Sequence, residues 1–213
     1  MTIREIRPED VPAVVGLVHE LAGYEREAES CRLTADQLAA ALFAPQPALF
    51  GHVAELDGAV VGCALWFLNF STWRGVHGIY LEDLFVQPAH RGHGLGRALL
   101  ARLAAICVQR GYCRLEWSVL DWNTPAIDFY RGIGAVGMDT WATYRLDGAA
   151  LSALGGAAGD GSDQGRGRAS GSTSSSASDQ SRDGSLISNR NATSTTTPAT
   201  IPSSSCLDGP SSE

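Results

Sequence analysis

Lysine is absent from this 213-residue chain, and all sixteen basic residues are arginines. The phosphate-binding loop G-x-x-x-x-G-K-[ST] needs a lysine, so nucleoside-triphosphate hydrolases of that type are excluded. The chain also lacks a run of about 18 apolar residues, the minimum for a membrane-spanning helix. Its start, MTIREIRPED, is charged where a signal peptide needs an apolar segment. We therefore expect a soluble, cytoplasmic protein that does not enter a membrane.

Metal-binding patterns are missing as well. The five cysteines form no C-x-x-C pair, and the five histidines form no H-E-x-x-H motif. We therefore expect reduced thiols, histidines at surface or core positions, and no metal. The net charge of −7 argues against nucleic-acid binding; it fits a cationic partner and fits equally a plain acidic surface.

The composition changes near residue 150. From Ser152 onward the chain is dominated by Ser, Thr, Gly, Asp and Asn, and no aromatic residue follows Tyr144. Such a segment cannot bury enough apolar area to offset an ordering entropy of about 1–2 kcal/mol per residue. The sequence therefore predicts a folded domain at residues 1–150 and a disordered low-complexity tail at 151–213, either inert or partner-binding.

The first 150 residues alternate between strand and helix periodicity. The expected strands cover residues 2–6, 49–56, 59–70, 78–86, 112–120 and 140–147, and the expected helices cover residues 8–24, 34–43, 95–111 and 123–134. Asp57-Gly58 predicts a tight hairpin between the second and third strands. The order β-α-α-β-β-β-α-β-α-β predicts an α+β domain whose central sheet is mixed, mostly antiparallel, and covered by helices on both faces.

A glycine-rich loop, HRGHGLGRALL, lies between a predicted strand and a predicted helix. The first amides of a helix are unpaired and carry the positive end of its dipole, and glycines let an anion approach the backbone. The loop therefore predicts a diphosphate site, although a tight connection without a ligand remains the alternative. A dinucleotide-binding fold is disfavoured because the third glycine of G-x-G-x-x-G is replaced by Arg97 or Leu99, even though Glu116 lies where that fold has its ribose acid.

Five stretches in one order, ELAGYE, STWRG, YLEDLFV, RGHGLG and VLDWNTPAIDFYRGIGA, resemble the GCN5-related N-acetyltransferases (the GNAT family) and within it the diamine acetyltransferase branch. STWRG and VLDWN resemble most the thialysine N-epsilon-acetyltransferases of that branch. The resemblance covers about residues 3–146. It implies the GNAT fold, acetyl-CoA as co-substrate, a small-molecule amine as acceptor, and a homodimer.

The resemblance also implies which residues contact acetyl-CoA. They lie on the third strand of the hairpin series, in the glycine loop, and at the start of the last predicted helix. These residues are Leu84, Phe85, Val86, Arg91, Gly92, His93, Gly94, Leu95, Gly96, Arg97, Asn123, Thr124, Pro125 and Ala126.

Two acids and a phenol are the candidate catalytic groups. Period-two alternation places Glu82 and Asp83 on opposite faces of their strand, so one of them faces a covered side unless the strand is bulged. A buried carboxylate would have a raised pKa and could accept the proton of an ammonium, directly or through water. By resemblance Glu82 is the substrate-side acid, Asp83 an auxiliary, and Tyr130 the general acid for the leaving thiolate. From the residues alone, a structural acid pair and a buried aromatic remain open.

The resemblance carries over a set of amine contacts, which are Tyr24, Glu25, Trp73, Glu82, Asp83, Glu116, Trp117, Ser118 and Asp139. Polyamine-specific members carry an acid just before the proline-tryptophan of this loop, whereas this chain reads Ser71-Thr72-Trp73. That departure favours thialysine or a lysine-like amine. A polyamine or protein-amine acetyltransferase and a non-catalytic acyl-CoA sensor remain the alternatives.

Overall fold

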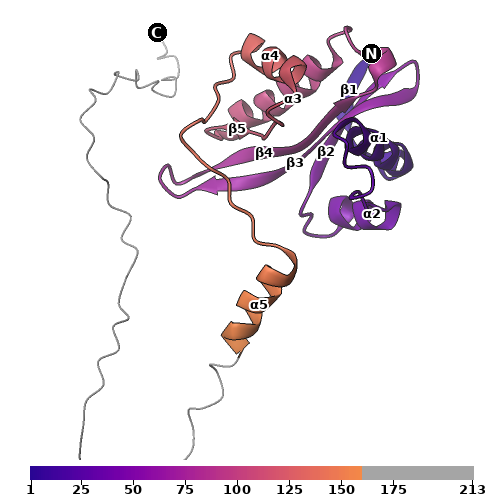
Figure 1. Ribbon diagram of the computed structural model, residues 1–213. Helices are drawn as coiled ribbons and strands as arrows, with labels where there is room; N and C mark the ends of the chain where they lie inside the picture. The colour runs from indigo at the N-terminus through magenta and orange to yellow at the C-terminus, as the bar shows by residue number, and fades with distance from the viewer. Residues whose placement is uncertain (160–213) are drawn as a thin grey trace, which may run out of the picture. The chain divides into compact units, whose positions relative to one another are not determined.

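The computed structural model describes residues 1–159, and a five-stranded sheet of order β1-β2-β3-β4-β5 lies at the centre of the fold (Figure 1). The strands are β1 (Thr2–Glu5), β2 (Phe50–Leu56), β3 (Ala59–Ser71), β4 (Val76–Val86) and β5 (Leu115–Glu116). The first four strands pair in antiparallel fashion, and β5 runs parallel to β4. The predicted mixed, mostly antiparallel sheet is confirmed.

Helices cover both faces of this sheet, as predicted (Figure 1). One face carries α1 (Val11–Tyr24) and α2 (Ala35–Phe43), and the other carries α3 (Leu95–Arg110) and α4 (Thr124–Gly132). Two short 3₁₀ helices, η1 (Pro8–Asp10) and η2 (Pro88–His90), precede α1 and the glycine loop. Each face has its own apolar core: Val14, Leu17 and Phe85 belong to the α1 side, and Leu81 and Leu99 to the α3 side.

Local sequence signals account for several of these boundaries. Asp57 and Gly58 both have positive φ, as a two-residue hairpin turn requires. Thr34 caps α2, its Oγ1 accepting a hydrogen bond from the Gln37 amide at 3.3 Å. The α3 helix starts after Gly94, whose φ of 77° is left-handed.

The predicted closing strand at residues 140–147 is wrong. No strand forms in the described chain beyond β5, and the side chains at residues 139–147 are exposed. A strand is stable only when its backbone groups pair with a neighbour, and β5 is two residues long. At β5 the alternating apolar pattern of this segment therefore meets an edge of only two residues.

A helix, α5 (Gly148–Gly159), forms where the sequence analysis placed the start of the disordered tail. Its alanines and leucines favour a helix, and its side chains as far as residue 157 are exposed. The chain divides into a unit at residues 1–142 and a second unit that begins at Thr143. The rest of the predicted tail, residues 160–213, lies outside the described residues.

No helix within residues 1–159 is long and apolar enough to cross a membrane. Within the same residues, no group of three or more His, Cys, Asp and Glu side chains is arranged to hold a metal ion.

Candidate active site

A β-bulge in the middle of β4 decides where its two acids point. Leu81 pairs with Trp66 and Asp83 pairs with Leu65, so Glu82 is the extra residue between two successive pairs. Directly opposed residues in antiparallel strands share a face. Asp83 therefore shares the α1 face with Leu65, while Leu81 shares the α3 face with Trp66.

Simple alternation is thus broken at this point of β4. Strict alternation would place Glu82 and Leu84 on one face and Leu81 on the other. The extra residue shifts the alternation by one position, so this placement does not hold. Leu81 and Leu84 both pack on the α3 side. The acid directed into a covered face is Asp83, which is half-buried, whereas Glu82 is exposed.

Burial and neighbouring charges change the acidity of Asp83. Removal from water raises the pKa of Asp83 to about 6, and the charges of Glu82 and Glu25 add to this rise. Burial raises the pKa of the Cys63 thiol on the same face, and the charge of Asp83 raises it further. A carboxyl group with a pKa near 6 is mostly ionised at neutral pH and still accepts a proton readily.

Glu25 links this acid to Tyr130. Glu25 follows the last residue of α1 and is half-buried, and burial raises the pKa of its own carboxyl. Burial raises the pKa of the Tyr130 hydroxyl, and the charge of Glu25 raises it further. Since Glu25 acts on both Asp83 and Tyr130, the fold brings together groups from β4, from the end of α1 and from α4.

The edge of β4 beside these groups is open. The β4–β5 ladder consists of two residue pairs, Ile79 with Leu115 and Tyr80 with Glu116. Beyond Tyr80, β4 pairs with β3 and with no other described strand. Unpaired backbone groups on such an edge can bind an extended ligand. Leu84 and Val86, which the resemblance assigned to acetyl-CoA, lie on this part of β4.

The end of α1 also contacts the start of α4. The Tyr24 hydroxyl donates a hydrogen bond to Asn123 Oδ1 at 3.2 Å. Asn123 is buried and caps α4, its Oδ1 accepting from the Ala126 amide at 3.4 Å. Tyr24 and Asn123 therefore hold the first turn of α4, with Thr124 and Pro125, against the end of α1. The sequence analysis assigned Tyr24 to the amine and Asn123 to acetyl-CoA.

Arg91 turns back toward β4. Its Nε donates to the Val86 carbonyl oxygen at 3.0 Å, and its guanidinium lies 5.1 Å from the centre of the Tyr24 ring and 5.6 Å from that of Phe85. Its charge is thus placed at the point where β4, α1 and the glycine loop meet, and Phe85 is a buried core residue of the α1 side.

The glycine loop has the form of an anion site. Gly92 and Gly94 have φ of 82° and 77°, and a Cβ at either position would meet no atom within 4 Å, so the space beside the loop is open. Leu95 begins α3 and is buried, which anchors the helix start. Arg97 is exposed in the first turn, and the His93 ring nitrogen Nδ1 lies 3.3 Å from the His90 carbonyl oxygen. These features fit a diphosphate.

Three predicted residues lie on or just after β5. The Glu116 carboxylate forms an ion pair with Arg114 at 2.9 Å and accepts from the Asn69 amide at 2.7 Å, so its charge is already compensated. Ser118 Oγ lies 2.8 Å from the Tyr80 hydroxyl. The ring of Trp117 packs 4.9 Å from that of Tyr130. Trp117 thus packs against the candidate general acid, and Glu116 is held by Arg114 and Asn69.

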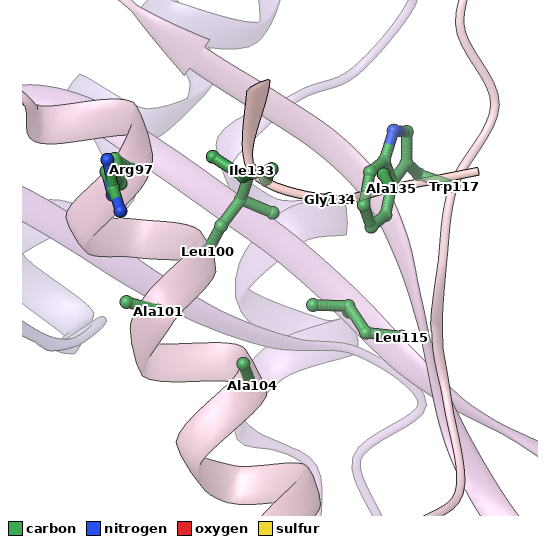
Figure 2. Close-up of a pocket in the computed structure, with 9 residues that line it drawn as sticks. All are labelled: Arg97, Leu100, Ala101, Ala104, Leu115, Trp117, Ile133, Gly134 and Ala135. Atoms are coloured by element: carbon green, nitrogen blue, oxygen red, sulfur yellow. The ribbon is translucent and has the colours of Figure 1, made fainter. Parts of the chain in front are cut away.

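A cavity of about 370 Å³ lies between α3 and β5. Figure 2 shows side chains of α3 on one wall and Leu115 and Trp117 on the other. Its lining residues are Arg97, Leu100, Ala101, Ala104, Leu115, Trp117, Ile133, Gly134 and Ala135. It is mainly apolar and includes none of the acids or Tyr130, so it is separate from the acid cluster of Glu25, Glu82 and Asp83.

Trp73 lies away from the acid cluster within the described chain. Trp73 is 92% exposed in the β3–β4 turn. At about 3.3 Å per residue, Glu82 lies roughly 20 Å along β4 from its start at Val76. Asp139 is exposed in a turn after α4.

Two residues that the sequence analysis did not assign join the site. Trp122 packs 6.0 Å from the Tyr24 ring, and the Arg26 guanidinium lies 5.1 Å from the Trp122 ring centre. Arg26 has a φ of 66°, a strained value for a residue with a side chain. Trp122 belongs to the quoted stretch VLDWN, so the motif pointed to it, whereas nothing local pointed to Arg26.

Comparison with known proteins finds a family and several relatives that this chain resembles. A sequence model of the acetyltransferase (GNAT) family matches residues 16–135. Thialysine N-epsilon-acetyltransferase of Bos taurus is 34% identical over 165 residues, covering 72% of this chain and 96% of the relative. L-ornithine N5-acetyltransferase of Arabidopsis thaliana is 30% identical, covering 71% of this chain and 86% of the relative.

Among solved structures, an integron cassette protein from the mobile metagenome of V. cholerae is similar in fold. It superposes with a TM-score of 0.62 at 27% sequence identity, covering 72% of this chain and 96% of its own.

Proposed function

This chain belongs to the GNAT family of acetyltransferases and is an acetyl-CoA-dependent acyltransferase, and we propose that its acceptor is the primary amine of a small lysine-like amino acid or a diamine. The observation that carries the proposal is the convergence of Asp83, Glu25 and Tyr130 beside the open edge of β4. Anionic groups there attract an ammonium, and the phenol supplies a proton.

The glycine loop and the start of α4 are the parts that would hold acetyl-CoA, which supplies the acyl group as a thioester. The amides at the start of α3, with Arg91 and Arg97, would bind its diphosphate. Leu84 and Val86 would donate backbone hydrogen bonds along the open edge of β4.

The acid pair of β4 would handle the acceptor amine. Glu82 is exposed on the bulge, where it can meet an incoming ammonium, and the pair takes up the ammonium proton through water. Tyr130 would donate its proton to the departing sulfur. The raised pKa of its hydroxyl keeps it protonated at neutral pH, as a general acid requires.

The substrate class rests on the relatives and on one departure in the sequence. The relatives act on thialysine and on L-ornithine by their names. By the resemblance, polyamine-specific members carry an acid just before this tryptophan, where this chain has Ser71 and Thr72. Because the turn lies roughly 20 Å along β4 from Glu82, this departure removes an anchor only for a cation outside the acid cluster. An acceptor with an α-carboxylate in place of a further ammonium is therefore favoured over spermidine.

An acceptor panel with isotope-labelled acetyl-CoA tests this function. Lysine is compared with 1,5-diaminopentane, and ornithine with 1,4-diaminobutane, because each pair shares its reacting amine and differs by the α-carboxylate. Thialysine, spermidine and a lysine-containing peptide complete the panel. We expect the amino acids to exceed the matched diamines by about tenfold in kcat/KM, a difference of about 1.4 kcal/mol.

The outcomes separate the alternatives. Higher kcat/KM with spermidine or with the peptide would replace the proposed acceptor class. If calorimetry shows CoA binding but no amine is acetylated, the proposed acetyltransferase activity is contradicted and a non-catalytic acyl-CoA sensor is favoured.

A further inference from the structure

We propose that Asp83, and not its neighbour Glu82, is the carboxylate that accepts the proton from the acceptor amine. This inference rests on the proposed function and deepens it by assigning the base. It goes against the resemblance, which places Glu82 on the substrate side and makes Asp83 an auxiliary.

The geometry of the bulge is the first argument. Glu82 is the unpaired residue and is exposed, so its carboxylate is solvated by bulk water. Asp83 is held in register opposite Leu65, half-buried on the α1 face. A rigid, partly dry carboxylate keeps its position without a cost in side-chain entropy, whereas an exposed one must be ordered in each turnover.

The lack of a compensating cation is the second argument. Within residues 1–159 the Asp83 carboxylate forms no ion pair and no side-chain hydrogen bond, in contrast to Asp10 and Glu116, which are each paired with an arginine. The charges that act on it are those of Glu82 on β4 and Glu25 at the end of α1, and its own charge acts on the buried Cys63 thiol on β3. A half-buried acid surrounded by acids and a neutral thiol has no structural partner to satisfy, which leaves it available for a proton.

The acidity of Asp83 suits the reaction. The pKa of Asp83, about 6, lies close to neutral pH, where a base combines a high ionised fraction with a high proton affinity. The bulge therefore separates two adjacent acids into a solvated carboxylate that attracts the cation and a half-buried one that takes its proton.

The proton balance of the step is complete. Asp83 takes one proton from the ammonium through a water, and the freed nitrogen lone pair forms the C–N bond while the C–S bond breaks with its electrons on sulfur. Tyr130 protonates the sulfur, and the second proton lost by the nitrogen restores the phenol through solvent. Asp83 returns its proton to bulk water, so each turnover releases one proton.

The test compares Asp83→Asn with Glu82→Gln in the full chain, with the best amine of the panel and over pH 5–9. In the unmodified protein we expect the acid limb of kcat/KM near pH 6. In Asp83→Asn that limb disappears, and kcat/KM at pH 7.5 falls by about 100-fold. In Glu82→Gln the limb remains and moves to lower pH, because the charge of Glu82 raises the pKa of Asp83.

The asparagine variant is expected to fold. A carboxyl whose pKa is raised by folding destabilises the folded state as pH increases from the unfolded value of 3.8 through about 6. Replacing it with a neutral isostere removes that effect, so the Tm of Asp83→Asn at pH 8 should equal or exceed that of the unmodified protein.

A measurement on the unmodified protein is independent of any variant. With ¹³C-labelled aspartate, the Asp83 carboxyl carbon should titrate at the same pH as the acid limb. An acid limb that survives in Asp83→Asn, one that disappears in Glu82→Gln, or a carboxyl titration well away from the limb would overturn the assignment. Turnover of no amine by the unmodified protein would instead contradict the proposed function itself.

Discussion

At the scale of single residues, environment sets chemistry that residue type leaves open. Glu82 and Asp83 are neighbours with similar side chains, yet one is exposed and the other is a half-buried group with a pKa of about 6. Tyr130 follows Phe129 on α4, and both pack against the α3-side core. Burial raises the pKa of the Tyr130 hydroxyl, and the charge of Glu25 raises it further.

Replacing Tyr130 with phenylalanine should lower kcat by about 10–1000-fold and leave CoA affinity unchanged, because only the proton donor is removed. Steady-state kinetics and calorimetry measure the two quantities. Tyr112→Phe is the matched control, since Tyr112 packs near His77 and away from the acids. Equal kcat in the two variants would remove the general-acid role.

At the scale of elements, α3 shows how glycines at its two ends serve different purposes. Its N-terminal loop faces open space, and a Cβ at Gly96 would have its nearest contact at 3.9 Å, with Phe129. Its C-terminal Gly111 has a φ of 66° and ends the helix in the left-handed conformation. Gly96 leaves room for an anion to approach the backbone, and Gly111 allows the chain to turn at the end of the helix.

Two alanine variants should therefore behave in opposite ways. Gly96→Ala should keep or raise the Tm, since the Cβ fits and alanine favours a helix, and should weaken CoA binding about tenfold. Gly111→Ala should lose about 1 kcal/mol of stability through the positive φ and bind CoA normally. Thermal unfolding measures the Tm of each variant, and calorimetry measures its CoA affinity. Unchanged CoA affinity in Gly96→Ala would show that the backbone there does not approach the diphosphate.

At the scale of the whole molecule, every residue of the proposed catalytic centre lies within the unit at residues 1–142. The second unit begins at Thr143, and within its described residues α5 presents exposed side chains. Residues 160–213, the rest of the tail that the sequence analysis placed at 151–213, lie outside the described residues. We propose that the enzyme is a homodimer.

A chain that ends at residue 159 should keep kcat/KM within about twofold and Tm within about 2 °C of the full chain, since the removed segment is dominated by Ser, Thr, Gly, Asp and Asn and such a composition offers little apolar surface to bury. Mass photometry should give the dimer mass for both. A loss of activity with the Tm retained would assign the tail a role in the reaction, and a shift of the short chain to monomers would assign it a role in assembly.

The sequence by itself determined most elements, because periodicity, turn residues and caps act locally. Asp57-Gly58, Thr34 and Gly94 lie where their chemistry requires. The motifs also indicated the family, since five stretches with defined spacing leave few alternatives. The strand predicted at residues 140–147 does not form, because a strand needs a neighbouring strand to pair with. The local sequence pattern does not show whether such a neighbour is available.

The tertiary structure decided what the acids do. One extra residue between two backbone pairs reverses a strand's parity, and the pattern of YLEDLFV does not show it because both acids can face either side. The approach of Glu25 to Asp83 and Tyr130 joins residues more than fifty positions apart, as does the contact of Arg26 with Trp122. Burial and charge are sums over spatial neighbours, so a pKa near neutrality arises only once the chain has folded.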